Sequence, residues 1–539
     1  MRILLIIFAF FFIVMSQVSG QNKTPKKRKV EITGNKLIHN KNMSDAVRLI
    51  LGNVKITHGN VVMYCDSAYF YNDSNRVEAY NNIHIIQNDS IHLYGDYLEY
   101  EGNTRFVKVR KNVRLVKKDM VLTTQNLDYD RNSDIAYYFD GGKIVDSGNT
   151  LTSKYGYFYA NDNESFFKDS VVAMNKEYTI FSDTLMYNTV TKVTKILGPT
   201  FIVSEENIIY CEDGYYDTAK DISVLKKNSY VEGRTSTIKG DTIYYDRKKR
   251  FGEVFGHMEL IDTTNNIIIK GGYGYYNELT KKAFATKKAT LLQIYQNDTL
   301  FLHSDTLKLD PVQDTINNAE SRLIRAFHHV KFFRTDFQGR CDSMIYDFRD
   351  SVNIFYHDPV LWAMGNQMTA QVIKLFTKNK VLYKAELENG AFIISPEDTL
   401  FFNQLKGKQM TGYIKENQLY KIDVEGNAQT IYYPKDQDVI IGANKAESSD
   451  MTIYLEEGHI KDIIMRNTPK GDLKPPVFLS EEDSKLKGFR WLEAFRPKNK
   501  YDIYKRDIIP KNEEETNIYE GFQIEDIKTT APSKAKEEK

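Results

Sequence analysis

The chain has 539 residues and a formal net charge of +1, and it contains 36 Tyr and 30 Phe but only 12 Pro. Aromatic residues fit a pleated, half-buried surface, so this composition favours β-strands. A net charge so close to zero supplies no overall field for nucleic acid, and past residue 20 no apolar run is long enough to span a bilayer as a helix. We therefore expect no nucleic-acid partner and no transmembrane helix in the exported chain.

The N-terminal 45 residues divide into two segments. Residues 1–20 predict a secretory signal peptide, since Arg2 precedes the unbroken apolar run Ile3–Val14 and small residues follow. No Cys lies near the expected cleavage point, so we expect a soluble protein without a lipid anchor. Residues 21–45 read as a basic N-terminal arm containing the run PKKRKV. After an export signal, a solvated segment or one near an anionic membrane surface is a better interpretation of this run than a nuclear signal.

A repeated unit then fills residues 46–465, which we divide into N-terminal repeats (46–190) and continued repeats (191–465). Val54–Tyr71 reads VKITHGNVVMYCDSAYFY, and about thirty residues later Ile83–Tyr100 reads IHIIQNDSIHLYGDYLEY. Each copy holds two short alternating strands, a small residue followed by an acid, and an aromatic-rich strand. A fixed period of this length predicts stacked units, each of which packs only against its neighbours.

One position, usually an acid, aligns the repeats. Its occupants are Asp66, Asp96, Gln125, Lys154, Asp183, Glu212, Asp241, Gly271, Asp305 and Asp342. In a plain strand this side chain would point to the same side as the apolar residues two and four positions later. We therefore predict a bend or bulge there, with the carboxylate accepting hydrogen bonds from the backbone.

Apolar side chains at a spacing of two predict one continuous inner face. The strand segments before the aligned acid and after it both contribute to this face. The residues that we expect to line it are Val54, Ile56, Ala68, Phe70, Ile83, Ile85, Leu98, Tyr100, Val113, Leu115, Leu127, Tyr129, Leu185, Tyr187, Ile243 and Tyr245.

Patterns typical of catalysis, metals or disulfides are weak. Cys65, Cys211 and Cys341 all occupy the slot before the aligned acid, several repeats apart, so we expect buried filler and no disulfide. Acids such as Asp298 and Asp305 could be cast as a glycosidase pair, but their recurrence at a repeat position favours a turn role. Because the histidines show no ligand spacing, we expect no metal, no cofactor and no catalytic residue.

The C-terminal 74 residues change in character. Residues 466–504 contain several prolines and the segment around Trp491, which we interpret as a short cap on the open end of the stack, with partner docking as the alternative. Residues 505–539 are charged and nearly free of aromatic residues, which favours a largely disordered tail.

The recurring pattern of strand, gap, D-x-L-x-Y, turn and strand resembles the OstA-like, or LptA-type, family of lipopolysaccharide-transport proteins. The likeness is clearest over Val54–Val145, for example in DYLEY (96–100), and extends weakly to about residue 465. It implies an all-β fold, an elongated β-jellyroll of stacked antiparallel strands with an apolar groove along its length. It also implies a periplasmic, non-enzymatic carrier or bridge that holds lipid A acyl chains of lipopolysaccharide in its groove, with outer-membrane association as a further option.

Partners implied by the same resemblance are lipopolysaccharide, other Lpt-type jellyroll proteins and an outer-membrane barrel translocon, with end-to-end self-association as a further option. Two alternatives remain from the residues themselves. A repeat protein with a filled core would act as a scaffold for envelope partners. A β-helix enzyme acting on polysaccharide would need a cluster of exposed carboxylates on one lateral face.

Overall fold

The computed structural model describes residues 30–39, 47–58, 60–146, 148–295, 297–314, 319–378, 381–398, 400–416, 418–436, 439–456, 459–475 and 478–507. Contacts divide the chain into two units, Met1–Tyr504 and Lys505–Lys539, and the fold described below is that of the first. The predicted signal peptide lies outside the described residues, as do the basic run and nearly all of the predicted tail.

Strands fill the first half of the described chain. They are β1 (Glu31–Thr33), β2 (Lys36–Ile38), β3 (Val47–His58), β4 (Val61–Tyr71), β5 (Arg76–Gln87), β6 (Ile91–Glu101), β7 (Phe106–Lys117), β8 (Met120–Asp130), β9 (Ile135–Tyr138), β10 (Gly142–Asp146), β11 (Asn149–Ser153), β12 (Tyr155–Tyr159), β13 (Glu164–Met174), β14 (Tyr178–Asn188), β15 (Val193–Ile196), β16 (Thr200–Ser204), β17 (Asn207–Cys211), β18 (Asp213–Asp217), β19 (Ile222–Gly233), β20 (Ser236–Asp246) and β21 (Phe251–Asp262).

The second half continues in the same way until three short helical turns. Its elements are β22 (Ile267–Asn277), β23 (Lys282–Ile294), β24 (Thr299–Asp314), β25 (Ala319–Arg334), β26 (Phe337–Asp347), β27 (Val352–Tyr356), β28 (Val360–Ala363), β29 (Asn366–Thr369), β30 (Val372–Lys378), β31 (Val381–Pro396), β32 (Phe402–Lys415), β33 (Gln418–Tyr432), β34 (Lys435–Asp436), β35 (Val439–Ile440), β36 (Ala443–Glu456), β37 (His459–Arg466), β38 (Lys470–Lys474), α1 (Glu481–Ser484), η2 (Glu493–Phe495) and η3 (Asp502–Tyr504).

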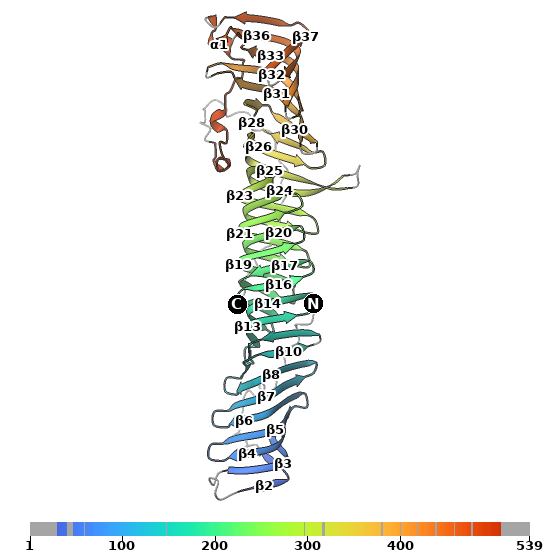
Figure 1. The fold of residues 1–539 in the computed structure, drawn as a ribbon, viewed down its shortest axis with the longest axis vertical. Coiled ribbons are helices and arrows are strands. Elements are labelled where there is room, and N and C mark those ends of the chain that lie inside the picture. Colours follow the sequence, from blue (N-terminus) through green and yellow to red (C-terminus); the bar gives the residue numbers. More distant parts are fainter. Residues whose placement is uncertain are drawn as a thin grey trace, which may run out of the picture. The chain divides into compact units, whose positions relative to one another are not determined.

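All but two of these strands belong to one antiparallel sheet, and β34 with β35 forms a separate pair. Each long strand pairs with the strands before and after it in the chain, as β4 does with β3 and β5. Where a strand is interrupted, two short strands take its place, so that β8 pairs with both β9 and β10. Figure 1 shows the resulting stack, in which the strand order in space follows the sequence. The elongated all-β jellyroll predicted from the repeats is confirmed.

A corner bends each level of the stack. Between β4 and β5 the register jumps from Tyr64 opposite His84 to Ser67 opposite Tyr80. The intervening Asn81 and Asn82 both have positive φ, at 59° and 48°. Asn and Gly tolerate this left-handed conformation best, and two such residues in succession turn the strand sharply. The same bulge recurs from repeat to repeat, for example at Lys111–Asn112 and Gly256–His257.

The predicted bend at the aligned acid is therefore observed, but the partner of the acid differs from the prediction. Asn82 Nδ2 donates to the Asp66 carboxylate at 2.9 Å, and Asn112 Nδ2 donates to Asp96 at 2.6 Å. The acid thus pairs with a side chain of the bulge on the adjacent strand, where solvent reaches it, and not with the backbone. One aligned residue was also misplaced, because Gly272, not Gly271, lies opposite a bulge.

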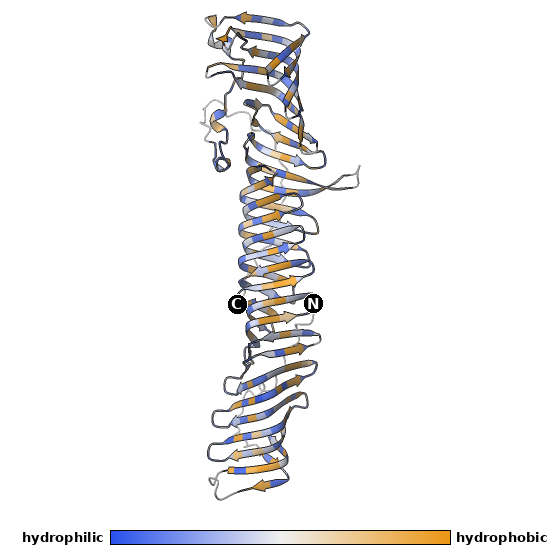
Figure 2. Ribbon diagram, in the orientation of Figure 1, coloured by the Kyte–Doolittle hydropathy of each residue, from blue (hydrophilic) through white to orange (hydrophobic). Residues whose placement is uncertain are grey.

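The corner separates two arms. We call arm 1 the strand segments that follow the bulge or precede the aligned acid, such as Val54–His58 and Val61–Cys65. Arm 2 comprises the segments on the other side, such as Val47–Leu51 and Ser67–Tyr71. The bulge shifts side-chain parity by one residue, so Cys65 and Ala68 both point inward and are buried. Apolar and polar residues alternate along the strands of both arms in Figure 2.

Residues 478–504 form a strap along the stack. Figure 1 draws this segment in red along one side of the stack, from α1 beside β36 to η3, which contacts β24 and β25. Its backbone is held by a glutamine at each of two levels: Gln404 bonds Ser484 O and Leu486 N, both at 2.8 Å, and Gln367 bonds Arg490 O at 2.8 Å and Leu492 N at 2.7 Å. The Trp491 segment, interpreted from sequence as a cap, makes these contacts laterally, with the outer face of arm 1 of its own chain.

Candidate functional site

The inner faces of the two arms form one apolar surface. A single cluster of buried side chains runs from Ile50 to Ile453. It contains or is packed by fourteen of the sixteen residues predicted to line the interior. The other two, Tyr187 and Tyr245, lie in the same strand positions, and the Tyr187 side chain is buried. The sequence thus identified the inward-facing row, while its role in binding stays a prediction.

At some levels near the N-terminal end, burial within this surface decreases from the corner toward the free ends of the arms, whereas Ile91 and Ile267 at other levels are buried at the end of arm 1. At one level Val54, next to the corner, is fully buried, whereas Ile56 is only partly buried. The same gradient separates Ala68 from Phe70, and Ile83 from Ile85. Side chains near the ends of the arms therefore present apolar surface that the protein itself does not cover completely. Such surface is available to an apolar ligand.

The interior is nearly filled in the middle of the stack. A cavity of about 20 Å³ lies between the arms and is lined mainly by apolar groups. Its lining comes from β14, β15, β16 and β18, with Ile180, Leu185, Ile196, Ile202 and Tyr216 among the residues. This volume is close to that of one water molecule, so a hydrocarbon chain could enter here only if the arms moved apart.

Ion pairs connect the free ends of the two arms around this region. Arg247 in the β20–β21 hairpin of arm 2 lies 3.7 Å from Glu177 in the β13–β14 hairpin of arm 1. Arg250 lies 3.6 Å from Glu206. Because the paired hairpins belong to strands several positions apart in the chain, the strands must run obliquely across the stack, as in a sheet that closes with shear.

A third pair of this kind joins Arg322 to Asp262. Burial raises the pKa of Asp262, but hydrogen bonds from Asn265 and the Arg322 guanidinium outweigh that effect, so the net pKa is lowered. We call the three pairs the arm latch: Arg247–Glu177, Arg250–Glu206 and Arg322–Asp262. The two exposed pairs, Arg247–Glu177 and Arg250–Glu206, contribute only about 0.2–1 kcal/mol each, so they hold the free ends together weakly.

One basic residue points toward the interior. Lys117 ends β7 and continues the inward row of Val113 and Leu115. Burial, and then the charge of Lys118, lower the pKa of Lys117 to about 8. A partly buried ammonium at the end of an apolar row would be stabilised by an anionic group placed beside it.

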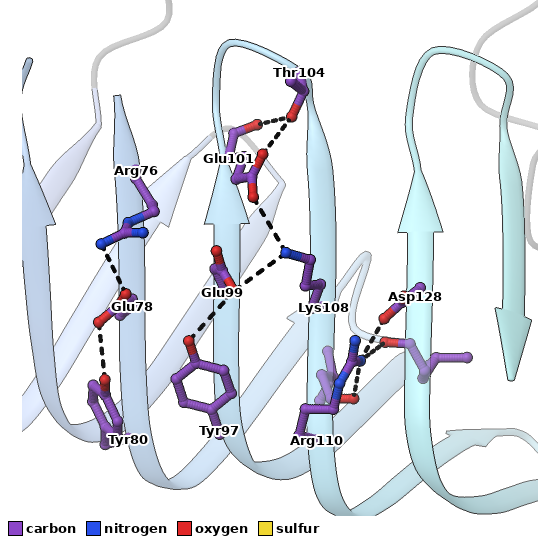
Figure 3. Close-up of polar contacts among 12 residues, drawn as sticks. Arg76, Glu78, Tyr80, Tyr97, Glu99, Glu101, Thr104, Lys108, Arg110 and Asp128 are labelled. Atoms are coloured by element: carbon purple, nitrogen blue, oxygen red, sulfur yellow. Dashed lines mark hydrogen bonds and ion pairs between the residues drawn. The ribbon is translucent and has the colours of Figure 1, made fainter. Parts of the chain in front are cut away.

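The outer face of arm 2 is polar and internally paired. Figure 3 shows Tyr97 and Lys108 both bonded to Glu99, with Lys108 also bonded to Glu101 at 3.2 Å. On the neighbouring strands Arg76 pairs with Glu78, and Arg110 pairs with Asp128. These side chains pair with one another along and across the strands, so the face reads as a self-complementary polar surface.

Cys65, Cys211 and Cys341 are buried and free. Among the described residues, no group of three or more His, Cys, Asp or Glu side chains is arranged to hold a metal ion. The described part of the chain also has no helix long and apolar enough to cross a membrane.

Sequence reasoning missed the arm latch and the glutamines that hold the strap. Arg247 and Arg250 occupy a hairpin whose residues show no unusual pattern, and their partners lie about 40 to 70 residues earlier in the chain. Gln367 and Gln404 occupy outward positions where any polar residue would be expected. No signal in a single sequence separates these residues from ordinary surface residues.

Comparison with known proteins adds a family for part of the chain. The family described as OstA-like protein matches residues 27–183. No curated protein matches the sequence. Among solved structures, LptH of Pseudomonas aeruginosa, titled the LptA homologous periplasmic component of the conserved lipopolysaccharide transport device, is 12% identical, with a TM-score of 0.21. That match covers 26% of this chain and 95% of LptH. Residues 27–183 of this chain are thus similar to the OstA-like family.

Proposed function

We propose that the protein carries the acyl chains of lipopolysaccharide between its two arms, as a non-enzymatic step in transport to the outer membrane. The observation that carries this proposal is the continuous inner apolar surface, which is only partly covered at Ile56, Phe70 and Ile85. The OstA-like family of residues 27–183 supports the choice of lipid. Export by residues 1–20, a periplasmic location, Lpt-type partners, an outer-membrane translocon and end-to-end association are parts of the same proposal.

The energetics permit such a carrier. Opening the two exposed pairs of the arm latch, Arg247–Glu177 and Arg250–Glu206, costs at most about 2 kcal/mol if each contributes up to about 1 kcal/mol, and the part-buried Arg322–Asp262 pair adds to that cost. Burying a methylene group contributes about 0.8 kcal/mol, so each buried methylene offsets nearly one exposed pair. Longer acyl chains would hold the arms apart with free energy to spare. Similar apolar sites at successive levels would let a chain move along the stack without one indispensable residue.

Photocrosslinking residues placed on opposite faces of the same strands test this function. Crosslinkers at Ile85, Leu98 and Leu185 point inward and should capture lipid in cells. Their sequence neighbours His84, Glu99 and Met186 point outward and serve as matched controls that should not. Equal lipid labelling on both faces, or none on the inner face, would contradict the proposal.

A second function is favoured by one observation, the cavity of only about 20 Å³ between β14 and β18. A stack that stays filled at this level would act as a structural scaffold whose surfaces bind envelope proteins. Such a scaffold predicts protein adducts from the outward positions and no lipid adduct at Leu185. It also predicts no lipid adduct at Ile85, because the core shields that side chain.

A further inference from the structure

The outer face of arm 1 carries an apolar patch in the middle of the stack. Its members are Met174, Phe181, Phe201, Val203 and Ile208, which are 50%, 47%, 41%, 36% and 37% exposed. They are neighbours by strand register, since Phe181 lies opposite Phe201 and Val203 lies opposite Ile208. Strand β16 supplies three successive apolar residues and is almost uniformly orange in Figure 2. We call these five residues the outer patch.

Along its row, the outer patch gives way to charged residues beyond Tyr230 on one side and beyond Thr152 on the other. The residues that lie opposite one another on successive strands form a row. From Phe181 and Phe201 the row passes through Tyr210 and Tyr230 to Lys239, and then to Glu259 and Lys270. In the other direction the row reaches Val172, Thr152 and Lys143. Single exposed apolar residues are ordinary, but a contiguous group within a charged row marks a binding surface.

Farther along the stack, the outer face of arm 1 binds a segment of its own chain. At β31 and β33 the outward residues Phe392, Ile394 and Ile431 are buried, and they cluster with Leu486 of the strap. Phe489 and Trp491 of the strap pack against this cluster. Where arm 1 is apolar on its outside, a polypeptide segment running across the strands therefore covers it.

We propose that the outer patch binds an extended segment of a partner protein, held across strands β13–β17 as the strap is held across β26–β33. The segment would supply aromatic and aliphatic side chains, like the strap residues Leu486, Phe489 and Trp491. Because the outer patch faces away from the interior, this interface is independent of lipid carriage.

Other occupants fit the surroundings less well. The arm 1 residues at the border are Lys176, Glu177, Glu205, Glu206, Glu232 and Arg234, a set with no excess of cations. Anionic lipid headgroups need such an excess, which disfavours a membrane surface. Residues 508–539 hold eight acidic and five basic side chains, so the border does not attract them either. A second copy of the chain would have no free strap to offer the outer patch, because its strap already covers its own arm 1.

Crosslinking in the native cell tests the interface. A photocrosslinker at Ile208 of the full-length chain should form an adduct that mass spectrometry maps to one defined segment of another protein. Matched controls at Thr123 and Lys239, exposed on the same face outside the outer patch, should form no such adduct. Adding Phe181→Ser and Phe201→Ser should lower the adduct yield at Ile208 at least tenfold while the variant stays folded with only a small drop in melting temperature, because each side chain is nearly half exposed.

A synthetic peptide of the mapped segment gives the quantitative check. It should bind the purified wild-type chain and bind the Phe181→Ser, Phe201→Ser variant at least tenfold more weakly. The proposal is overturned if Ile208 gives no adduct, if its adduct maps to lipid, to residues 508–539 or to a second copy, or if the double variant binds the peptide as tightly as wild type. Lipid labelling at Ile85 is unaffected by any of these outcomes, so lipid carriage and this interface fail separately.

Discussion

At the scale of single residues, the fold depends on two recurring choices at each corner. The bulge needs side chains that tolerate positive φ, and the slot before the aligned acid needs a small side chain that can be buried. Cys65, Cys211 and Cys341 fill that slot, as Gly95 and Ser182 do at other levels. Their role is to pack against the corner, and their chemistry follows from that burial.

The thiols should be unreactive in the folded protein. Burial and then the nearby Asp66 raise the pKa of Cys65 to about 11, and burial and then Asp213 raise that of Cys211 to about 12. At pH 8 the thiolate fraction is therefore small, and iodoacetamide should alkylate none of the three cysteines until denaturant is added. Mass spectrometry reads the result. Rapid alkylation of Cys211 in the native protein would show that the corner is open.

Lys117 gives the fold a pH dependence of defined sign. Because its pKa in the folded state is about 8, below the ordinary value near 10.4, the unfolded chain binds more protons between these limits. Stability contributed by this group therefore rises with pH through that window. Lys117→Met should be more stable than wild type at pH 7 by up to about 1 kcal/mol after screening is allowed for. This advantage should shrink as the pH approaches 10.5.

Urea unfolding at pH 7 and at pH 10 measures this difference. Lys143→Met, on the exposed outer face of arm 1, serves as the control and should show no such change with pH. A Lys117→Met advantage that is constant over the whole range would mean that burial of the ammonium is not its cause.

Inward positions could be predicted from sequence because strand periodicity alone sets them, as at Val54 and Ile56. The partner of the aligned acid could not be, since Asn82 reaches Asp66 from the adjacent strand. The assignment of Gly271 failed for a related reason: a bulge shifts the register by one residue, and glycine has no side chain to reveal its side.

At the scale of elements, the strap is the part that the sequence could not place. Its composition indicated a segment that packs on something, but Gln367 contacts residues more than 120 positions later. Gln367 on β29 and Gln404 on β32 each offer a side-chain carbonyl oxygen and an amide N–H to the backbone of the strap. This pair of bonds imitates one step of strand pairing. Both glutamines are nearly fully buried, so an apolar replacement would leave backbone groups without partners.

Replacing these glutamines should release the strap. Gln367→Leu with Gln404→Leu removes four hydrogen bonds to the strap, and each backbone group left buried and unpaired costs about 1–3 kcal/mol. Limited proteolysis should then cut between residues 485 and 500 much faster than in wild type. Gln429→Leu, on the same outer face, is the control. Unchanged cleavage in the double variant would mean that apolar contacts alone hold the strap.

At the scale of the whole molecule, two weakly joined arms enclose an apolar surface, and the arm latch decides how readily that surface opens. Arg247→Glu places like charges where Arg247 now meets Glu177. The loss of up to about 1 kcal/mol corresponds to as much as a fivefold increase in opening. Lipid crosslinking at Leu185 should increase accordingly.

Reversing both partners separates the latch from a general loss of charge. The Arg247→Glu, Glu177→Arg variant restores the attraction and should return the Leu185 lipid yield to the wild-type value. If the double variant behaves like the single variant, the pair does not control opening.

Native mass spectrometry of the full-length protein, purified from its own envelope without added lipid, tests the central claim most directly. The account predicts masses above the bare chain that correspond to bound lipid bearing the acyl chains of lipid A, and it predicts that replacing Ile85 and Phe70 by aspartate lowers their share without abolishing it, because the apolar surface continues at other levels. A wild-type protein that emerges free of lipid would contradict it.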